Sequence, residues 1–187
     1  MIESRKDYLS YLEKDRLALA QLRKKPKLFG DEVWKFQRLL RRIEYYTNCR
    51  RSLFWKPNFL FLKFRFRRLS IRLSFDIPCN VFGPGLSIAH YGTIVVNGAA
   101  RIGANCRIHT CVNIGTKAGH TYLAPKIGDN VYIGPGVKIF GPIEIANGIA
   151  IGANSVVNKS FEEPNISIAG VPARKISDKG SEGLIIH

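Results

Sequence analysis

The sequence predicts a mainly β fold, a parallel β-helix of hexapeptide repeats with an N-terminal α-helical segment and one extruded loop. The first observation is a period of six, which fits neither one face of a helix nor the in-out alternation of a strand. Aliphatic residues recur at Ile102, Ile108, Ile114, Ile127, Ile133, Ile139, Ile145, Ile151 and Val157. If each hexad is a short strand ending in a turn, three hexads close a triangular coil and the aliphatic residues stack inward.

The second observation is a glycine directly after many of these aliphatic residues. It stands at Gly103, Gly115, Gly128, Gly134 and Gly152. A glycine there lets the backbone turn a corner that a side chain would crowd. An ordinary β-sandwich with regular turns is the competing interpretation, and the number of in-register positions favours the β-helix.

The third observation is an uneven charge. The formal net charge is +15, of which residues 1–75 carry +13 and the remaining 112 residues only +2. This asymmetry predicts a boundary near Phe75. We expect a basic N-terminal helical region over 1–75, a β-helix domain over 76–176 and a C-terminal tail over 177–187.

Two helices are predicted in the first fifty residues. Residues 3 to about 25 contain a partial stripe of leucines, and Pro26 and Gly30 end it. Asp31 is expected to cap a second helix, whose apolar residues follow one face. These apolar residues are Val33, Phe36, Leu40, Ile43 and Tyr46.

The segment from Cys49 to Phe75 mixes large apolar residues with arginine and lysine, and its spacing fits either a strand or a helix. Three uses are open: a solvated basic face over an apolar face that packs on the first coils, binding of an anionic glycan or phosphate-bearing acceptor, and contact of residues 50–72 with an anionic membrane surface. At such a surface each Lys or Arg contributes about 1 kcal/mol. Nucleic acid is not expected as a partner, because no recognised nucleic-acid motif accompanies the charge.

Residues 76–101 contain several prolines and glycines and read as a first, irregular coil. Ile127 follows Ile114 by thirteen positions where two hexads would give twelve, so the segment from Gly115 to Lys126 is predicted to be an extruded loop. Long loops on rigid scaffolds often carry binding groups, although a plain surface insertion is the alternative.

Four cysteines, Cys49, Cys79, Cys106 and Cys111, lack the C-x-x-C spacing of a metal site. We expect reduced thiols of a cytosolic protein, with Cys106 and Cys111 as small buried apolar residues. The first residues are too charged for a signal peptide, and no apolar run approaches the ~18 residues that a membrane span needs. The protein is therefore expected to be cytoplasmic, at most at the inner face of a membrane.

Four histidines, His90, His109, His120 and His187, are the candidates for proton transfer. A neutral imidazole near pH 7 can take a proton from an attacking hydroxyl. His109 follows Ile108 at a predicted corner and is equally compatible with packing or with an outward polar position. His120 lies in the extruded loop. Composition and spacing alone do not choose among them.

Several motifs together resemble the serine acetyltransferase branch of the hexapeptide acyltransferases. They are DIPCNVFGPGLSIAHYGTIVV from Asp76, PKIGDNVYIGPGVKIFG after the loop, IGANSVV, and AGVPARKI near the end, and they cover residues 76–176. The resemblance implies left-handed coils, a helix rather than a strand before Phe75, acetyl-CoA as co-substrate, no required metal, and a homotrimer with sites between subunits.

The resemblance also assigns the site. His90, in HYGTIVV, would be the general base, and Asp76 would orient it, although the chain is one residue shorter between the two. Backbone N–H groups at Gly115 and Thr116 would stabilise the oxyanion. The remaining assignments are Thr116, Pro135, Gly136 and Ala153 along the pantetheine arm, Arg174 or Lys175 at the nucleotide phosphates, and His120 and Lys126 in the substrate loop. Gly136 and Ala153 are also what a tight corner needs, and Arg174 is also compatible with a solvated tail charge.

Two departures from the resemblance concern the acceptor. Serine acetyltransferases end the loop in Arg-His-Pro-Lys, where this chain has Leu123 and Ala124 before the proline, and Ala89 stands where an acidic residue precedes the base. A site without these charged contacts binds a zwitterion poorly. The short chain, with SIAHYGTIVVN and IGPGVKIFG, resembles the acetyltransferases of bacterial capsule, exopolysaccharide and lipopolysaccharide gene clusters.

We therefore predict an acetyl-CoA-dependent O-acetyltransferase that acts on a hydroxyl of a sugar or polysaccharide precursor. A serine O-acetyltransferase of cysteine biosynthesis is the first alternative. A non-catalytic β-helix scaffold is the second.

Overall fold

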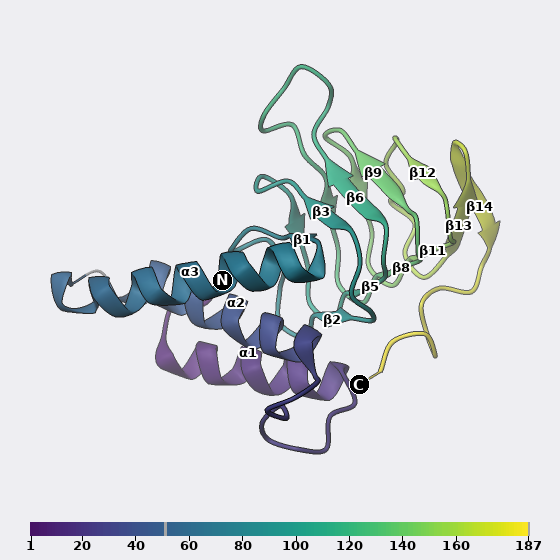
Figure 1. Cartoon of the computed structure of the whole chain (residues 1–187). Coiled ribbons are helices and arrows are strands. Elements are labelled where there is room, and N and C mark those ends of the chain that lie inside the picture. The colour runs from purple at the N-terminus through teal and green to yellow at the C-terminus, as the bar shows by residue number, and fades with distance from the viewer. Residues whose placement is uncertain (51, 187) are drawn as a thin grey trace.

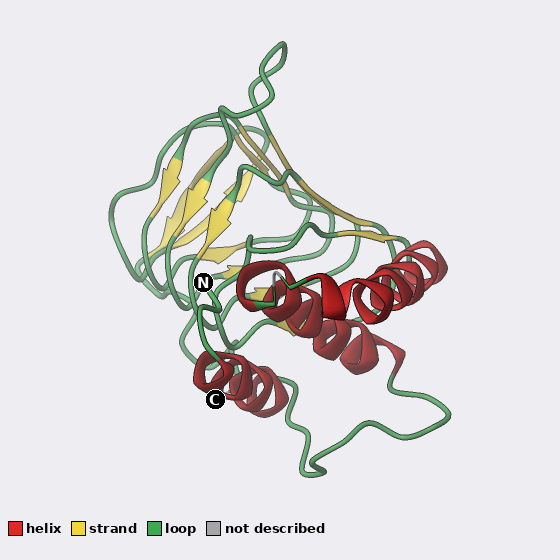
Figure 2. Ribbon diagram, turned by 90° about the vertical axis from the view of Figure 1, so that its left-hand side faces the viewer, coloured by secondary structure: helices red, strands yellow, loops and turns green. Residues whose placement is uncertain are grey.

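The computed structural model describes residues 1–50 and 52–186 of the chain. Arg51 of the basic segment and the terminal His187 lie outside the described residues. Figure 1 shows the α-helices packed beside one end of a stack of short strands, and Figure 2 shows the same stack viewed from that end.

The strands form three sheets, here called faces A, B and C. Face A contains β1 (Phe75–Asp76), β3 (Ile94–Val96), β6 (Val112–Gly115), β9 (Lys138–Phe140) and β12 (Val156–Val157). Face B contains β4 (Arg101–Ile102), β7 (Lys126–Ile127) and β10 (Glu144–Ile145). Face C contains β2 (Ser87–Ile88), β5 (Arg107–Ile108), β8 (Tyr132–Ile133), β11 (Ala150–Ile151), β13 (Ser167–Gly170) and β14 (Ala173–Ser177). The chain visits the faces in turn, and the predicted fold class, a left-handed parallel β-helix of hexapeptide repeats, is confirmed.

The aliphatic residues of the hexads form three inward columns, one on each face. Face B stacks Ile102 on Ile127, face C stacks Ile108 on Ile133, and face A stacks Ile114 on Ile139. All nine hexad residues are buried, none of them more than 5% exposed. Burial of these side chains supplies the hydrophobic driving force for the stack, so the period of six is the signature of its core.

The coils turn at the third residue after an aliphatic position. Asn105, Asn130 and Asn154 have φ near 55°, and Gly136 and Gly148 also have positive φ. Asparagine and glycine tolerate this left-handed region better than other residues. The glycine that directly follows the aliphatic residue serves another purpose than the predicted turn. A Cβ at Gly103, for example, would lie 2.7 Å from the backbone of Gly128 in the next coil.

Three α-helices and one short 3₁₀ helix precede the coils in the described residues. They are α1 (Arg5–Ala18), α2 (Glu32–Cys49), η1 (Leu53–Trp55) and α3 (Lys56–Leu73). The prediction that the first helix reaches about residue 25 is wrong. Ala20 takes a left-handed φ of 52°, and Leu22 is 96% exposed, so the last leucine of the stripe has no core to join.

Asp31 precedes α2 as predicted, but its side chain does not cap the helix. Its backbone is left-handed, and its Oδ2 accepts a hydrogen bond of 2.8 Å from the Lys27 N–H. The same oxygen lies 3.0 Å from a guanidinium nitrogen of Arg23. The carboxylate therefore stabilises the loop between the first two helices instead of the first turn of α2.

The basic segment forms a helix, α3, and the strand alternative is wrong. Leu62 and Leu73 are buried, and Phe66 and Leu69 pack against the main core. The ring of Phe66 stacks on Phe36 of α2 with centroids 5.1 Å apart. This spacing is that of one helix face, which the alternation of a strand would have scattered over both sides of a sheet.

A buried ion cluster joins the helices to the first coil. The Arg41 Nε lies 2.8 Å from Asp15 Oδ2, and its Nη1 lies 3.0 Å from Glu44 Oε2. Arg41 also donates to the carbonyl oxygens of Phe82 and Gly83. One guanidinium therefore faces two carboxylates, and backbone N–H groups donate to the remaining carboxylate oxygens, so each buried ion has partners as burial requires.

Polar side chains of α1 and α2 also bind the backbone of the first coil directly. Asp15 Oδ1 accepts hydrogen bonds of 2.9 Å from the N–H groups of Gly85 and Leu86. Gln37 donates to the Leu86 carbonyl and accepts from the Ile88 N–H. At the other end of the stack, β14 pairs antiparallel with β13. The first and last coils of face C are therefore both covered.

All four cysteines are free thiols. Cys106 is buried as expected, and burial raises the pKa of its thiol to about 12. Cys111 is exposed, so that prediction is wrong. It occupies a turn position with φ of 60°, which holds its side chain away from the inward column. In the described residues, no helix combines the length and the apolar character that a membrane crossing requires.

Candidate functional site

His90 lies at the corner between faces C and A, after β2 and before β3, and its side chain is exposed. Two backbone hydrogen bonds fix the corner. The Ala89 N–H donates to the Ile108 carbonyl at 3.0 Å, and the Gly92 N–H donates to the Leu73 carbonyl at 3.1 Å. Gly92 has φ of 132°, which favours glycine. The imidazole is thus carried by a rigid turn and is free to meet a ligand.

Several of the predicted cofactor residues lie below His90 on the same corner. The strand register aligns Ile88, Ile108, Ile133, Ile151 and Ile168 along face C. The residues two positions later therefore form one outward column, here called the corner column, which consists of His90, Thr110, Pro135, Ala153 and Gly170. Neighbouring coils are about 4.8 Å apart, so four steps carry this column about 19 Å.

Gly136 is held at this corner by its backbone. Its φ is +76°, and its N–H donates to the Thr110 carbonyl at 2.9 Å. A Cβ at Gly136 would lie 2.0 Å from the Asn154 Oδ1. The turn alone therefore accounts for this glycine, and it also keeps the corner beside Pro135 free of side chains.

Arg174 and Lys175 lie at the far end of the corner column, on β14. Arg174 pairs with Ala169 of β13, next to Gly170. The Lys175 Nζ lies 2.6 Å from Asp178 Oδ1 and 2.6 Å from Glu163 Oε1. These hydrogen bonds, Asp178 first, raise the pKa of Lys175. Arg174 is exposed and has no ion pair with a described residue, so it is the better placed of the two for an anionic ligand.

The loop residues lie at the opposite end of face A. Gly115 ends β6, Thr116 and His120 follow, and Lys126 begins β7 on face B. Both Figure 1 and Figure 2 show this loop projecting away from the stack and from the helices. The four residues of β6 span about 13 Å. One chain therefore does not bring its own loop onto the corner that carries His90.

The loop has its own internal hydrogen bonds. The Lys117 N–H donates to the Leu123 carbonyl at 2.9 Å, and the His120 N–H donates to the Lys117 carbonyl at 3.0 Å. The rings of His120 and Tyr122 contact each other edge to face, and both side chains are exposed. The predicted extruded loop is confirmed as a structured segment.

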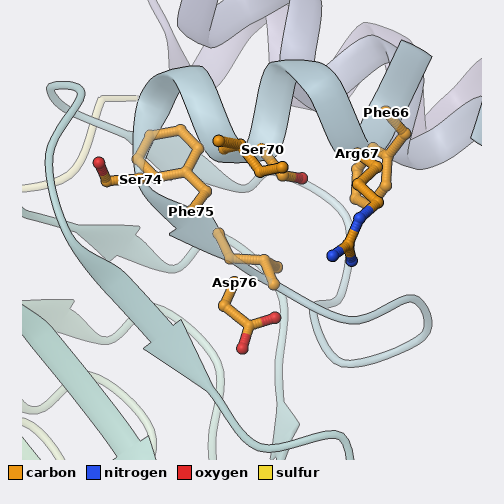
Figure 3. A pocket seen from close by; sticks show the side chains of 8 residues that line it. Phe66, Arg67, Ser70, Ser74, Phe75 and Asp76 are labelled. Carbon is orange, nitrogen blue, oxygen red and sulfur yellow. The ribbon is translucent and has the colours of Figure 1, made fainter. Parts of the chain in front are cut away.

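Asp76 lies on β1 at the outer side of face A, opposite Val95 of β3. It borders a cavity of about 370 Å³ under α3, together with Arg67, Ser70 and Ser74. Figure 3 shows its carboxylate at the edge of this cavity, beneath the helix. Within residues 1–50 and 52–186, no hydrogen bond or ion pair connects Asp76 to His90. The predicted orienting role of Asp76 stays a prediction.

His109 is the residue that the sequence left undecided. Its ring centroid lies 6.2 Å from that of His90 and 5.1 Å from that of Tyr132 in the following coil. Its Nε2 is buried with no hydrogen-bond partner among the described residues. Burial first, and then the charges of Arg107 and His90, lower the pKa of His109. The hexad register could have predicted that these two histidines are neighbours. His90 stands two residues after Ile88, and His109 directly follows Ile108, which is aligned with Ile88 on the next coil.

Comparisons with known proteins point to one enzyme class. No family model matches the sequence. The serine acetyltransferase of Salmonella typhimurium is 38% identical over 117 residues, which are 62% of this chain and 42% of that protein. A crystal structure of serine acetyltransferase from Brucella abortus has a TM-score of 0.76 and 28% identity, and the match covers 96% of this chain and 73% of that one. A complex of the same enzyme with coenzyme A also has a TM-score of 0.76, with 27% identity over 96% and 71% of the two chains.

The similarity is thus to serine acetyltransferases, and the predicted likeness to capsule acetyltransferases finds no match among these proteins. The chain spans less than half the length of the Salmonella relative. The coordinates of the Brucella enzyme also match the helices of this chain, because the match covers nearly all of it.

Proposed function

We propose that this chain is an acetyl-CoA-dependent O-acetyltransferase with His90 as its general base. The corner column carries this proposal, because an exposed imidazole lies at its first coil and Arg174, whose guanidinium has no ion pair with a described residue, lies at its far end. A thioester lying along the column would have its reacting carbonyl beside His90 and its phosphates near Arg174. The coenzyme A complex of the Brucella relative supports this donor.

The proposed chemistry uses one proton twice. His90 removes the proton of the acceptor hydroxyl while the hydroxyl oxygen attacks the thioester carbonyl. The imidazolium then gives that proton to the departing thiolate, so an acetyl ester and free CoA are formed. Such help contributes roughly 100-fold to 10,000-fold. The N–H groups of Gly115 and Thr116 are the proposed donors to the oxyanion.

The proposed assembly is a homotrimer with one site at each interface. His90 and the extruded loop lie at opposite ends of face A, so each copy offers two half-sites. In a ring of three, the loop corner of one copy would meet the His90 corner of the next. Sedimentation velocity of the full chain should give the mass of a trimer, and a fully active monomer would contradict this arrangement.

The hydroxyl of serine is the first acceptor that we propose. The support is the class of the relatives, which are serine acetyltransferases in both the sequence and the structure comparisons. The predicted cytoplasmic location stays part of this proposal. The predicted membrane contact of residues 50–72 depends on the surface of α3 and not on the acceptor.

Specific residues favour a second acceptor, a hydroxyl of a sugar or polysaccharide precursor. Ala89 precedes His90, and Leu123 and Ala124 end the loop, so none of these positions offers a charge to a zwitterion. An uncharged acceptor needs no charged side chain at these positions, whereas an amino acid would lack ionic partners for its amino and carboxylate groups. The non-catalytic scaffold remains the third possibility.

Release of CoA from acetyl-CoA tests these proposals. We would compare the wild type and His90→Ala with serine, with nucleotide sugars and with capsular oligosaccharides. Serine-dependent release that is lost in His90→Ala supports the first acceptor, and release with a sugar alone supports the second. Both variants should bind CoA equally. If the wild type binds CoA but releases none with any acceptor, the scaffold is favoured and the proposed reaction is contradicted.

A further inference from the structure

A large groove between α2, α3 and the loop before α2 has no part in the proposed reaction. Its volume is about 1100 Å³. Its basic lining residues are Lys35, Arg38, Arg42, Arg65, Arg68 and Arg72. Glu32 is the acidic residue of the lining, and its carboxylate lies 3.2 Å from Lys35 Nζ. The groove therefore has a strong excess of positive charge.

The arginines of this groove are not neutralised within the described chain. Arg65, Arg68 and Arg72 are exposed and have no ion pair with a described residue. The whole of α3 contains neither aspartate nor glutamate. Two of these guanidinium groups lie over aromatic rings of the same helix, Arg65 over Phe61 at 5.8 Å and Arg68 over Phe64 at 5.7 Å.

Large apolar side chains line the same groove and face solvent. Leu28 is 83% exposed, Phe29 85%, Phe61 57% and Phe64 59%. Helix α3 buries Leu62 and Leu73 instead, so Phe61 and Phe64 are not part of its buried contacts. Figure 1 shows that the first turns of α3 extend beyond the coil stack.

Exposed aromatic side chains lie here beside arginines that have no ion pair within residues 1–50 and 52–186, and this combination is typical of a membrane-binding surface. Phenylalanine and leucine partition into the boundary between lipid headgroups and acyl chains, and arginine attracts anionic headgroups. A second copy of this chain would place two sets of like charges face to face, which Coulomb repulsion opposes. We propose that this groove docks on an anionic phospholipid membrane, with Phe29, Phe61 and Phe64 at the lipid boundary and the arginines at the headgroups.

The inference goes beyond the proposed reaction and does not depend on it. Docking of this kind would hold the full chain at a membrane without a spanning helix. The cation-bearing face of α3 and the loop at Phe29 would bind together, because both line one groove.

Vesicle co-sedimentation of the full chain tests this proposal. The chain should pellet with vesicles of phosphatidylcholine mixed with phosphatidylglycerol, and stay in solution with phosphatidylcholine alone. Each basic residue near the surface contributes about 1 kcal/mol, so the combined variant R65E/R68E/R72E should bind at least about 100-fold more weakly. Added salt should weaken binding of the wild type, because the attraction is screened.

Two further variants separate the effect of the groove from that of net charge, and the effect of the aromatic rings from that of the arginines. The combined variant K14E/K159E/K179E makes the same change in net charge at exposed positions outside the groove and should pellet like the wild type. The variant F61S/F64S keeps every charge and should lose binding severalfold. The comparison requires that each variant has the circular dichroism spectrum and the elution volume of the wild type. If R65E/R68E/R72E misfolds, F61S/F64S and the salt series still test the proposal.

Four results would overturn the inference. Equal binding to both kinds of vesicle would exclude recognition of anionic lipid. If R65E/R68E/R72E and F61S/F64S both bind anionic vesicles as tightly as the wild type, the membrane contact lies elsewhere on the molecule. A smaller assembly in F61S/F64S, without any vesicle binding by the wild type, would assign the groove to a second copy of this chain. Binding of inorganic phosphate without vesicle binding would assign it to a soluble anion.

Discussion

His90 and His109 lie on consecutive coils with their ring centroids 6.2 Å apart. Tyr132 of the next coil covers His109 from the other side, with centroids 5.1 Å apart. The Nε2 atom of His109 is buried without a partner among the described residues, so a charge there would be poorly solvated. The fold therefore favours the neutral form of this imidazole, close to the proposed general base.

The pH dependence of stability should reveal this preference. Burial lowers the pKa of His109 below the ordinary value of 6.5. In the unfolded chain the imidazole takes up a proton as the pH falls through that value, while the folded chain resists it. Unfolding therefore becomes easier on acidification, down to the lowered pKa of the folded state. We expect His109→Phe to reduce this dependence as the pH falls below about 6.5, measured by urea unfolding. The exposed His120→Phe should leave it unchanged, and equal slopes in all three proteins would refute the argument.

The contributions of His90 and Asp76 should be unequal. Because no hydrogen bond connects them in the described structure, Asp76→Asn should lower kcat much less than His90→Ala. For His90→Ala we expect a loss of roughly 100-fold to 10,000-fold. Steady-state kinetics with the active acceptor measures both. Equal losses would show that the two side chains work as a pair in the complex.

Arg174 and Lys175 should differ in their effect on acetyl-CoA. Lys175 already has two carboxylates within 2.6 Å, whereas Arg174 has no ion pair with a described residue. Arg174→Gln should raise the KM for acetyl-CoA about tenfold, because a hydrogen bond to a charged group is worth about 1.5 kcal/mol. Lys175→Gln serves as the matched control with little change in KM. A larger increase in KM for Lys175→Gln than for Arg174→Gln would place the phosphates of acetyl-CoA on the other side of β14.

Truncation of an inward hexad residue should destabilise the stack strongly. Ile133 is fully buried between Ile108 and Ile151 on face C. Ile133→Ala should lower the free energy of unfolding by about 2–5 kcal/mol, through lost burial and the cavity it leaves. Leu22→Ala, at a side chain that is 96% exposed, should change it by less than about 0.5 kcal/mol. Denaturant unfolding measures both.

The coils could be predicted because each hexad carries one aliphatic residue at the position that points into the core. Ile102, Ile108 and Ile114 mark one coil. The step of thirteen residues from Ile114 on face A to Ile127 on face B, where one hexad would give six, marks the loop. The end of α1 could not be found in the same way. Leu19 and Leu22 continue a helical stripe, but only packing against α2 decides which leucines have a partner, and Leu22 has none in the described structure.

The site was less predictable, because its residues meet through the register of the coils. His109 became a neighbour of His90 only once Ile88 and Ile108 were aligned on face C. The turn at Asn105 shows a second limit. The sequence draws attention to Gly103, but the positive φ lies two residues later, where asparagine can also adopt it.

The covered ends of the stack determine how long it can grow. A parallel β-helix that stops abruptly leaves a row of free backbone donors and acceptors, which can template another chain in the manner of an exposed edge strand. Here the side chains of Asp15 and Gln37 accept hydrogen bonds from backbone N–H groups of the first coil. At the other end, β14 pairs with β13 of the last coil. The same repeats without these closures would tend toward end-to-end polymers, so the short helical segment and the final hairpin keep this protein a discrete particle.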